Sequence, residues 1–134
     1  MPTQESIRSG QQSIAPQTVI DSLIFLNFKD GARTPELLIS MLRDMTPNDL
    51  RRFLYLATAQ CSIPAGGLQN PYPLATNPDK ITIQSLGRSD SRRLPVGRAC
   101  FYRVDMPEYE DRDLLREKLG ATLGHLDGAG FDLD

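Results

Sequence analysis

Two Thr-Pro pairs, Thr34-Pro35 and Thr46-Pro47, constrain the fold of this chain more than any other feature. Threonine is a common N-cap and proline is favoured in the first turn of a helix, so each pair predicts a helix start. Apolar residues at helical spacing follow each pair and predict one buried face per helix. These residues are Leu37, Leu38, Met41, Leu42 and Met45 in the first helix, and Leu50, Phe53, Leu54, Ala57 and Cys61 in the second. Almost no chain separates the two helices, so we expect a compact corner or hairpin.

The rest of the chain predicts strands, a long loop and a third helix. Val19–Phe28 is apolar and fits a strand or a short buried segment. Prolines and glycines fill residues 62–79, which predicts a loop, whereas Lys80–Leu86 and Ala99–Val104 have strand character. Arg112–His125 predicts a helix, with a buried stripe of Leu115, Leu119, Leu123 and Leu126. Together these elements predict an α+β fold, a two-layer α/β arrangement in which helices pack on a small mixed sheet.

Length and composition fit a single folded domain. The chain has 134 residues, of which 40% are hydrophobic and 24% charged. Residues 1–17 are polar and predict a flexible tail or linker, which leaves residues 18–134 as the domain.

Charge and hydropathy exclude several classes of function. The net charge of -2 argues against a nucleic-acid-binding protein, which should show a basic stripe. No apolar run approaches the roughly 20 residues that span a bilayer, so no membrane partner is expected. The first residues lack the pattern of a signal peptide, which makes a cytoplasmic or nuclear location the expectation.

The two cysteines, Cys61 and Cys100, are too few for a disulfide framework. His125 is the only histidine, and no Cys/His group has the spacing of metal ligands. Neither a metal ion nor another cofactor is therefore expected.

Cys100 is the first candidate for chemistry. A thiol reacts as the thiolate, which nearby positive charge favours, and Arg98 and Arg103 are close in sequence. In an extended strand, Arg98 would point to the same side as Cys100. The alternative is that Cys100 is a small buried residue of the sheet, because free cysteines are often buried.

Other residues allow both a chemical and a structural interpretation. Cys61 fits core packing at the end of its helix. His125 could serve Cys100 as a general base in a cysteine hydrolase, although a surface histidine fits its polar helix better. Phe131 is an aromatic residue in a Gly-rich tail, where it could pack back onto the core or dock elsewhere for activity. The arginines of residues 88–98 could form a basic face or a solvated loop; they are Arg88, Arg92, Arg93 and Arg98.

The segment from Leu94 to Leu119 resembles the catalytic block of HECT ubiquitin ligases. That block has a Leu-Pro pair, a Cys-Phe pair, a Pro-x-Tyr turn and a helix with an L-R-E-K-L-like core. The matching residues are Leu94-Pro95, Cys100-Phe101, Pro107-Glu108-Tyr109 and Leu115-Arg116-Glu117-Lys118-Leu119. The upstream segment Met45–Leu68 also looks like the family pattern, and Phe131 stands where family members place a phenylalanine. The resemblance covers roughly residues 34–134.

The resemblance implies the C-terminal lobe of such a ligase, with Cys100 as the carrier of a ubiquitin thioester. It implies that Phe131, Arg98 and Asp132 support transfer to lysine, and that Leu94, Pro95 and Phe101 are structural residues of the motif. The implied partners are ubiquitin, a conjugating enzyme bound through a separate N-terminal lobe, and protein substrates. Residues 1–17 would then be a linker between lobes, and the lobe itself is expected to be a monomer.

Four positions depart from the family pattern. Val96 and Ala99 stand in place of threonines, Arg98 in place of a frequent histidine, and Tyr102 in place of asparagine. Ala99 removes a hydroxyl that could donate a hydrogen bond near the thiol. The second interpretation is therefore a non-catalytic module that binds ubiquitin or a regulator.

Overall fold

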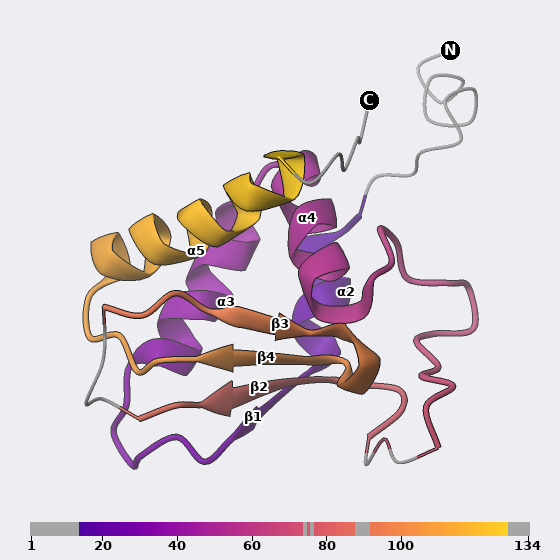
Figure 1. Cartoon of the computed structure of the whole chain (residues 1–134), viewed down its shortest axis with the longest axis horizontal. Helices are drawn as coiled ribbons and strands as arrows, with labels where there is room; N and C mark the ends of the chain where they lie inside the picture. Colours follow the sequence, from indigo (N-terminus) through magenta and orange to yellow (C-terminus); the bar gives the residue numbers. More distant parts are fainter. Residues whose placement is uncertain (1–13, 74, 76, 88–91, 129–134) are drawn as a thin grey trace.

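The structure is a computed structural model that describes residues 14–128, apart from residues 74, 76 and 88–91 and the side chains of residues 126–128. Within these residues, helices pack on one face of a small sheet (Figure 1). The elements are α2 (Pro16–Asp21), β1 (Leu23–Leu26), α3 (Thr34–Asp44), α4 (Pro47–Thr58), β2 (Ile81–Ser85), β3 (Val96–Arg98), the 3-10 turn η1 (Ala99–Phe101), β4 (Arg103–Met106) and α5 (Arg112–Gly128). The predicted α+β fold is confirmed.

The sheet is mixed and has the strand order β1-β2-β4-β3. β1 and β2 run parallel, as do β2 and β4, whereas β3 runs antiparallel to β4 at the edge. Side chains alternate between the two faces, so Ile81, Ile83 and Val104 enter the core beneath the helices. The residues that alternate with these along the strands, such as the paired Thr82 and Arg103, face away from the helices.

The helices α3 and α4 begin at the predicted Thr-Pro pairs, but Thr34 is the first residue of α3 and not its cap, because its hydroxyl donates to the Tyr109 carbonyl. The Thr46 hydroxyl oxygen accepts a hydrogen bond from the Asp49 N–H at 3.2 Å and so caps α4.

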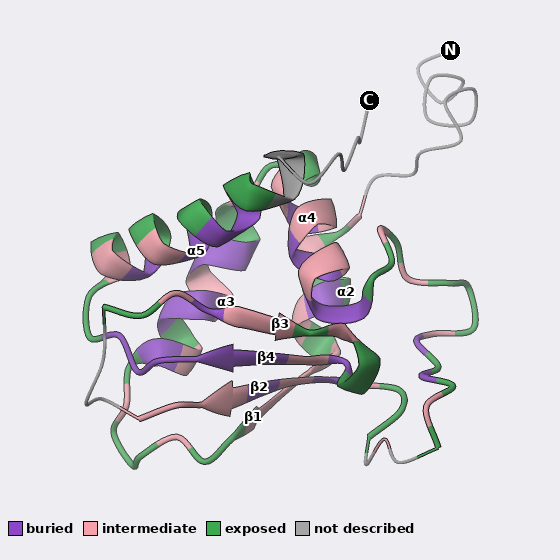
Figure 2. Cartoon of the chain, viewed as in Figure 1, coloured by how far each residue is buried: buried purple, intermediate pink, exposed green. Residues whose placement is uncertain are grey.

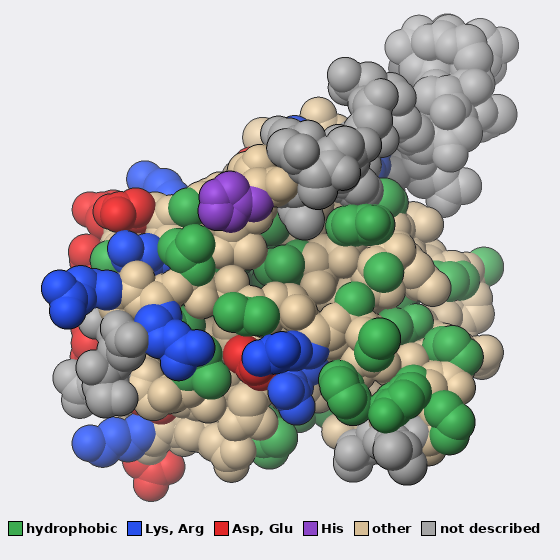
Figure 3. Space-filling view, in the orientation of Figure 1, with side chains coloured by type: hydrophobic (Ala, Val, Ile, Leu, Met, Phe, Trp, Pro, Cys, Tyr) green, Lys and Arg blue, Asp and Glu red, His purple; other side chains and the backbone are tan. Residues whose placement is uncertain are grey.

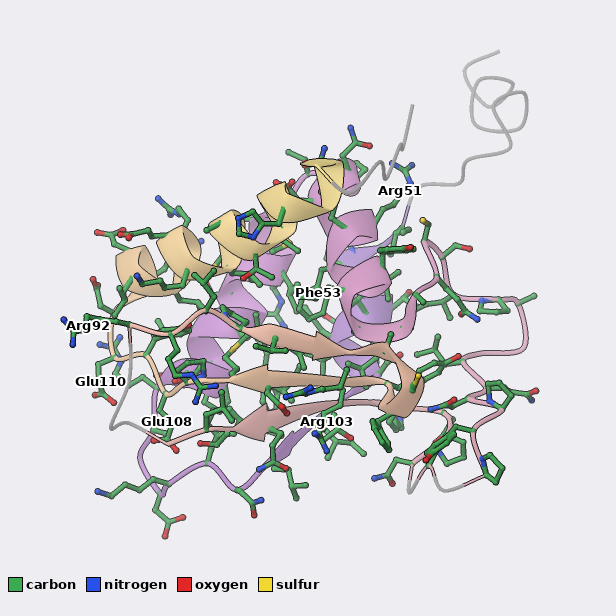
Figure 4. The ribbon with its side chains drawn as sticks, in the orientation of Figure 1. Arg51, Phe53, Arg92, Arg103, Glu108 and Glu110 are labelled. Carbon is green, nitrogen blue, oxygen red and sulfur yellow. The ribbon has the colours of Figure 1, made fainter. Side chains whose placement is uncertain are left out.

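Four predicted residues of each apolar face are buried, whereas Met45 and Cys61 lie beyond the ends of the helices and are half-buried. Phe53 points from α4 into the core (Figure 4). Buried segments face the interior on β4, α3 and α5 as well (Figure 2). The helix α4 packs directly against β3 and β4, whereas α3 packs against α2 and α5.

The region before α3 differs from the sequence prediction. Instead of one element over residues 19–28, the chain forms the short helix α2 and then the strand β1. Pro16 stands in the first turn of α2, where a missing N–H does no harm, and Val19 is fully buried. The helix begins at Pro16, two residues before the predicted domain start at residue 18.

The segment Pro107–Tyr109 connects β4 to α5 and is buried. Glu108 accepts a hydrogen bond from the Ser85 hydroxyl at 2.6 Å, and the Tyr109 carbonyl accepts one from the Thr34 hydroxyl at 2.9 Å (Figure 4 labels Glu108). Burial raises the pKa of the Tyr109 hydroxyl, which donates to the Arg93 carbonyl. These contacts tie the end of the sheet to α3 and to the chain that enters β3.

Among the described helices, none is both long and apolar enough to cross a bilayer.

Candidate functional site

Cys100 lies in a turn between two antiparallel strands. Ala99–Val104 does not form the single strand that its composition predicts: β3 ends at Arg98, η1 reverses the chain, and β4 begins at Arg103. The prediction fails because the reversal contains no glycine, proline or asparagine to mark it. The turn is closed by the Tyr102 N–H, which donates to the Ala99 carbonyl at 3.0 Å. Cys100 is exposed, so the alternative of a buried sheet residue is wrong. Figure 2 shows the turn between β3 and β4 coloured as exposed.

The strand β3 is held close to α4 and α5. A Cβ atom at Gly97 would overlap the Leu56 carbonyl oxygen and would lie 2.7 Å from Leu56 Cδ1, so only glycine allows this approach. The Thr122 hydroxyl donates to the Pro95 carbonyl at 3.2 Å. Pro95 is buried and Leu94 is half-buried. The Leu-Pro pair therefore lies where the chain enters the strand that leads to Cys100.

Tyr102 closes the turn in a left-handed conformation. Its φ of 51° and ψ of 56° strain a non-glycine residue, typically by about 1–2 kcal/mol. Its ring is buried, with 3% of the residue exposed, and its hydroxyl donates to the Gln69 carbonyl at 3.2 Å. Asparagine, the family residue at this position, tolerates the left-handed region better. Here burial of the tyrosine ring offsets the strain.

The loop after α4 supplies a residue that the sequence did not single out. Asn70 is buried, and its side-chain amide donates to the Cys100 carbonyl at 2.9 Å. The dipeptide Asn70-Pro71 marks a turn in sequence, but nothing in the sequence indicates which distant backbone group the amide would contact.

The two arginines nearest to Cys100 both bind a carboxylate. Arg98 and Arg103 are direct cross-strand partners at the base of the turn. Asp105 lies 3.0 Å from Arg98 Nε and 2.9 Å from Arg103 Nε, and the second contact is an ion pair without hydrogen-bond alignment. Asp105 thus offsets the repulsion between facing like charges. The expectation that an extended strand directs Arg98 to the side of Cys100 fails, because the strand ends before Cys100.

An apolar surface lies beside Cys100. Phe101 is 44% exposed, and its ring meets the Tyr72 ring edge-on with centroids 5.1 Å apart. The Arg103 guanidinium lies 5.4 Å from the Phe101 centroid. Hydrophobic side chains gather on this part of the surface, over the turn and the loop that follows α4 (Figure 3). Phe101 is therefore a surface residue.

The remaining candidates lie elsewhere or outside the described residues. His125 is exposed on α5, which Figure 1 places well apart from the turn that joins β3 and β4, so the structure does not bring it to Cys100. Arg92 and Arg93 are exposed, whereas Arg88, Phe131 and Asp132 lie outside the described residues. Among described side chains, no group of three or more His, Cys, Asp or Glu could hold a metal ion.

The helical period predicted that Cys61 lies on the buried face of α4. In the structure it lies beyond the end of that helix. The helix ends early because Ala59 takes a left-handed conformation, with φ of 62°. Cys61 is half-buried. Desolvation raises the pKa of its thiol, and the charge of Arg51 opposes this effect.

The sequence of the chain is similar to that of known proteins. A model of the HECT-domain (ubiquitin-transferase) family matches residues 3–134. The chain is 27% identical over 120 residues to the bifunctional serine/threonine-protein kinase/NEDD4-like E3 ubiquitin-protein ligase of Dictyostelium discoideum, a match that covers 85% of the chain and 6% of that protein.

Two fungal relatives match at higher identity. The identity is 31% over 104 residues to probable E3 ubiquitin-protein ligase HUL4 of Eremothecium gossypii, covering 78% of the chain and 11% of the relative. It is 35% over 82 residues to E3 ubiquitin-protein ligase pub3 of Schizosaccharomyces pombe, covering 61% and 10%. The matched segments thus make up 6% to 11% of these relatives. By the extent of the family match, the chain belongs to the HECT-domain family of ubiquitin transferases.

Proposed function

We propose that Cys100 accepts ubiquitin as a thioester and passes it to a lysine amine. The observation that carries this proposal is the exposure of Cys100 in a turn whose backbone is fixed by neighbouring elements. An exposed thiol on a held backbone suits a nucleophile that must meet a large protein partner. Membership of the HECT family supports ubiquitin as the acyl group. The relatives are ubiquitin ligases as whole proteins, so the activity of this segment is a proposal.

The proposed reaction has two acyl transfers. The Cys100 thiolate attacks the carbonyl carbon at the C-terminus of ubiquitin, a new C–S bond forms, and the C–S bond to the conjugating enzyme breaks. The released thiolate of the conjugating enzyme then takes up a proton. In the second step a lysine amine forms a C–N bond with the same carbonyl carbon and releases the Cys100 thiolate. The amine loses a proton to a base, for which Asp132 is the proposed group.

The supporting roles follow from chemistry and position. Arg98 binds Asp105, so its proposed role is to hold the base of the turn rather than to pair with the thiolate. Phe131 is proposed to anchor the C-terminal segment during transfer to lysine. A conjugating enzyme and protein substrates are the further proposed partners, with a conjugating enzyme bound outside residues 18–134.

A direct acyl-transfer assay tests the proposal on the chain itself. Ubiquitin joined through its C-terminus to a small thiol as a thioester is incubated with the chain, and products are separated on a non-reducing gel. We expect a ubiquitin adduct that a thiol reductant removes, with Cys100 as the modified residue by peptide mass. Cys100→Ala should abolish the adduct, and Cys61→Ala should keep it. A reductant-sensitive adduct that persists in Cys100→Ala would contradict the proposal.

A non-catalytic ubiquitin-binding module is the second candidate. Two observations favour it: Asp105 engages both arginines near Cys100, and Ala99 has no hydroxyl to donate to a thioester. In that case ubiquitin would bind the chain, as measured by NMR titration, but no adduct would form at Cys100.

A further inference from the structure

Asn70 joins the loop after α4 to the backbone of Cys100. Its side-chain Nδ2 donates to the Cys100 carbonyl at 2.9 Å, and its Oδ1 accepts from the Tyr72 N–H at 3.0 Å. Its own backbone N–H donates to the Pro78 carbonyl at 2.8 Å. With 9% of the residue exposed, Asn70 makes these bonds largely out of water, where they hold geometry more firmly. One side chain thus fixes both its own loop and the peptide group that follows the thiol.

The Cys100 carbonyl lies beyond the pairing of the two strands. The β3–β4 register ends at Arg98 and Arg103, so the peptide groups of η1 are outside the ladder. A displacement of the peptide group between Cys100 and Phe101 would move the Cα atom of Cys100 and the thiol that it carries. The Asn70 amide opposes that displacement, because it would break the 2.9 Å hydrogen bond and leave the largely buried amide without its acceptor.

We propose that Asn70 is a positioning residue for Cys100, acting through the Cys100 carbonyl during acceptance of the acyl group. This inference rests on the proposed function of Cys100 as the ubiquitin carrier. Acyl transfer requires the sulfur to approach the carbonyl carbon along a narrow set of directions, and a misplacement of about 1 Å can slow a reaction about 100-fold. A buried amide at 2.9 Å from the backbone of the reacting residue restricts the thiol to fewer directions.

A second hydrogen bond between the same loop and the same turn provides a matched control. The Tyr102 hydroxyl donates to the Gln69 carbonyl at 3.2 Å. Gln69 directly precedes Asn70 in the loop, and Tyr102 lies two residues after Cys100 in the turn. It anchors the loop but does not touch the Cys100 peptide. If anchoring the loop is all that matters, Tyr102→Phe should have the same effect as a change at Asn70.

The test measures acyl transfer from the ubiquitin small-thiol thioester to the full chain as the thioester concentration is varied. In Asn70→Ser, the hydroxyl oxygen can still accept from the Tyr72 N–H, but the serine side chain is too short to reach the Cys100 carbonyl. Asn70→Asp keeps the shape and replaces the donor by an oxygen that repels the carbonyl. Asn77→Asp adds the same charge at an exposed site in the same loop. Thermal unfolding of every variant gives the folded fraction, to which each rate is normalised.

We expect both Asn70 variants to lower the maximal rate of adduct formation by about ten-fold, with the half-saturating thioester concentration unchanged. Tyr102→Phe and Asn77→Asp should react at close to the wild-type rate. Equal rates in Asn70→Ser and wild type, or an equal loss in Tyr102→Phe, would overturn the inference while leaving the proposed function in place. If the wild-type chain forms no adduct at Cys100, the proposed function fails and the inference falls with it.

Discussion

Two turns of this molecule use the same backbone conformation to different ends. The turn after α4 and the turn between β3 and β4 each contain a cysteine and a non-glycine residue in the left-handed region, Ala59 with φ of 62° and Tyr102 with φ of 51°. In the first turn, Ala59 is exposed and Cys61 is half-buried. In the second, Tyr102 is buried and Cys100 is exposed.

The difference lies in which residue of each turn enters the core. Ala59 needs only its own N–H, which donates to the Tyr55 carbonyl at 2.8 Å, to end a helix. Tyr102 instead places a ring in the core and a hydroxyl on the loop, which leaves the residues before it outside. In the second turn, the exposure of the thiol thus follows from the burial of the large side chain two residues later.

Replacing the left-handed residues by glycine should have opposite effects in the two turns. Tyr102→Gly relieves strain but removes a buried ring and a hydrogen bond, so we expect the free energy of unfolding to fall by about 3 kcal/mol. Ala59→Gly relieves strain of about 1 kcal/mol against a loss of chain entropy, so stability should rise by about 0.5 kcal/mol. Urea unfolding of both variants measures these changes. A stabilised Tyr102→Gly would mean that the ring does not hold the turn.

Gly97 should be intolerant of even one added methyl group. Gly97→Ala forces β3 away from the Leu56 carbonyl, and we expect a loss of about 2 kcal/mol of stability, typical of overpacking. Gly120→Ala is the matched control, because a Cβ there meets nothing within 4 Å and alanine favours the helix α5. It should gain about 0.5 kcal/mol. Thermal unfolding distinguishes the two, and equal stability of both variants would contradict the close contact.

The two thiols should differ in alkylation by iodoacetamide. Burial raises the pKa of the Cys61 thiol, so a smaller fraction of this thiol is ionised near neutral pH. The Cys61 thiol is also less accessible than that of Cys100. At pH 7.5 we expect Cys100 to be labelled about ten-fold faster than Cys61, measured by peptide mass spectrometry. Raising the pH above about 8.5, the ordinary range of a thiol, should narrow the ratio as Cys61 ionises. A ratio that stays constant with pH would show that access alone sets the difference.

The sequence predicts the helices well because their signals are local. The Thr46 cap, the prolines of the first turns and the apolar spacing depend on neighbours within a few residues, and α3, α4 and α5 form where expected. The prediction of one strand over Ala99–Val104 is wrong because local signals alone do not determine the backbone there. The residues of this segment have strand character one by one, but the contact of Gly97 with Leu56 and the burial of the Tyr102 ring reverse the chain, and both involve distant residues.

The site was predictable only in part. The ordered motif around Cys100 indicates the cysteine, and the exposure of the thiol agrees with a reactive role. The amide of Asn70 reaches Cys100 across 30 positions of sequence, which no local pattern encodes. Likewise, the charges of Arg98 and Arg103 suggest help for a thiolate until the structure shows them on Asp105.

The shared carboxylate of Asp105 has a consequence for how this hairpin can evolve. Because two facing guanidiniums depend on one acid, a substitution at Asp105 alone leaves repulsion, and a substitution at one arginine alone leaves the acid half-compensated. The free-energy cost of a substitution at any one of the three positions therefore depends on which residues occupy the other two.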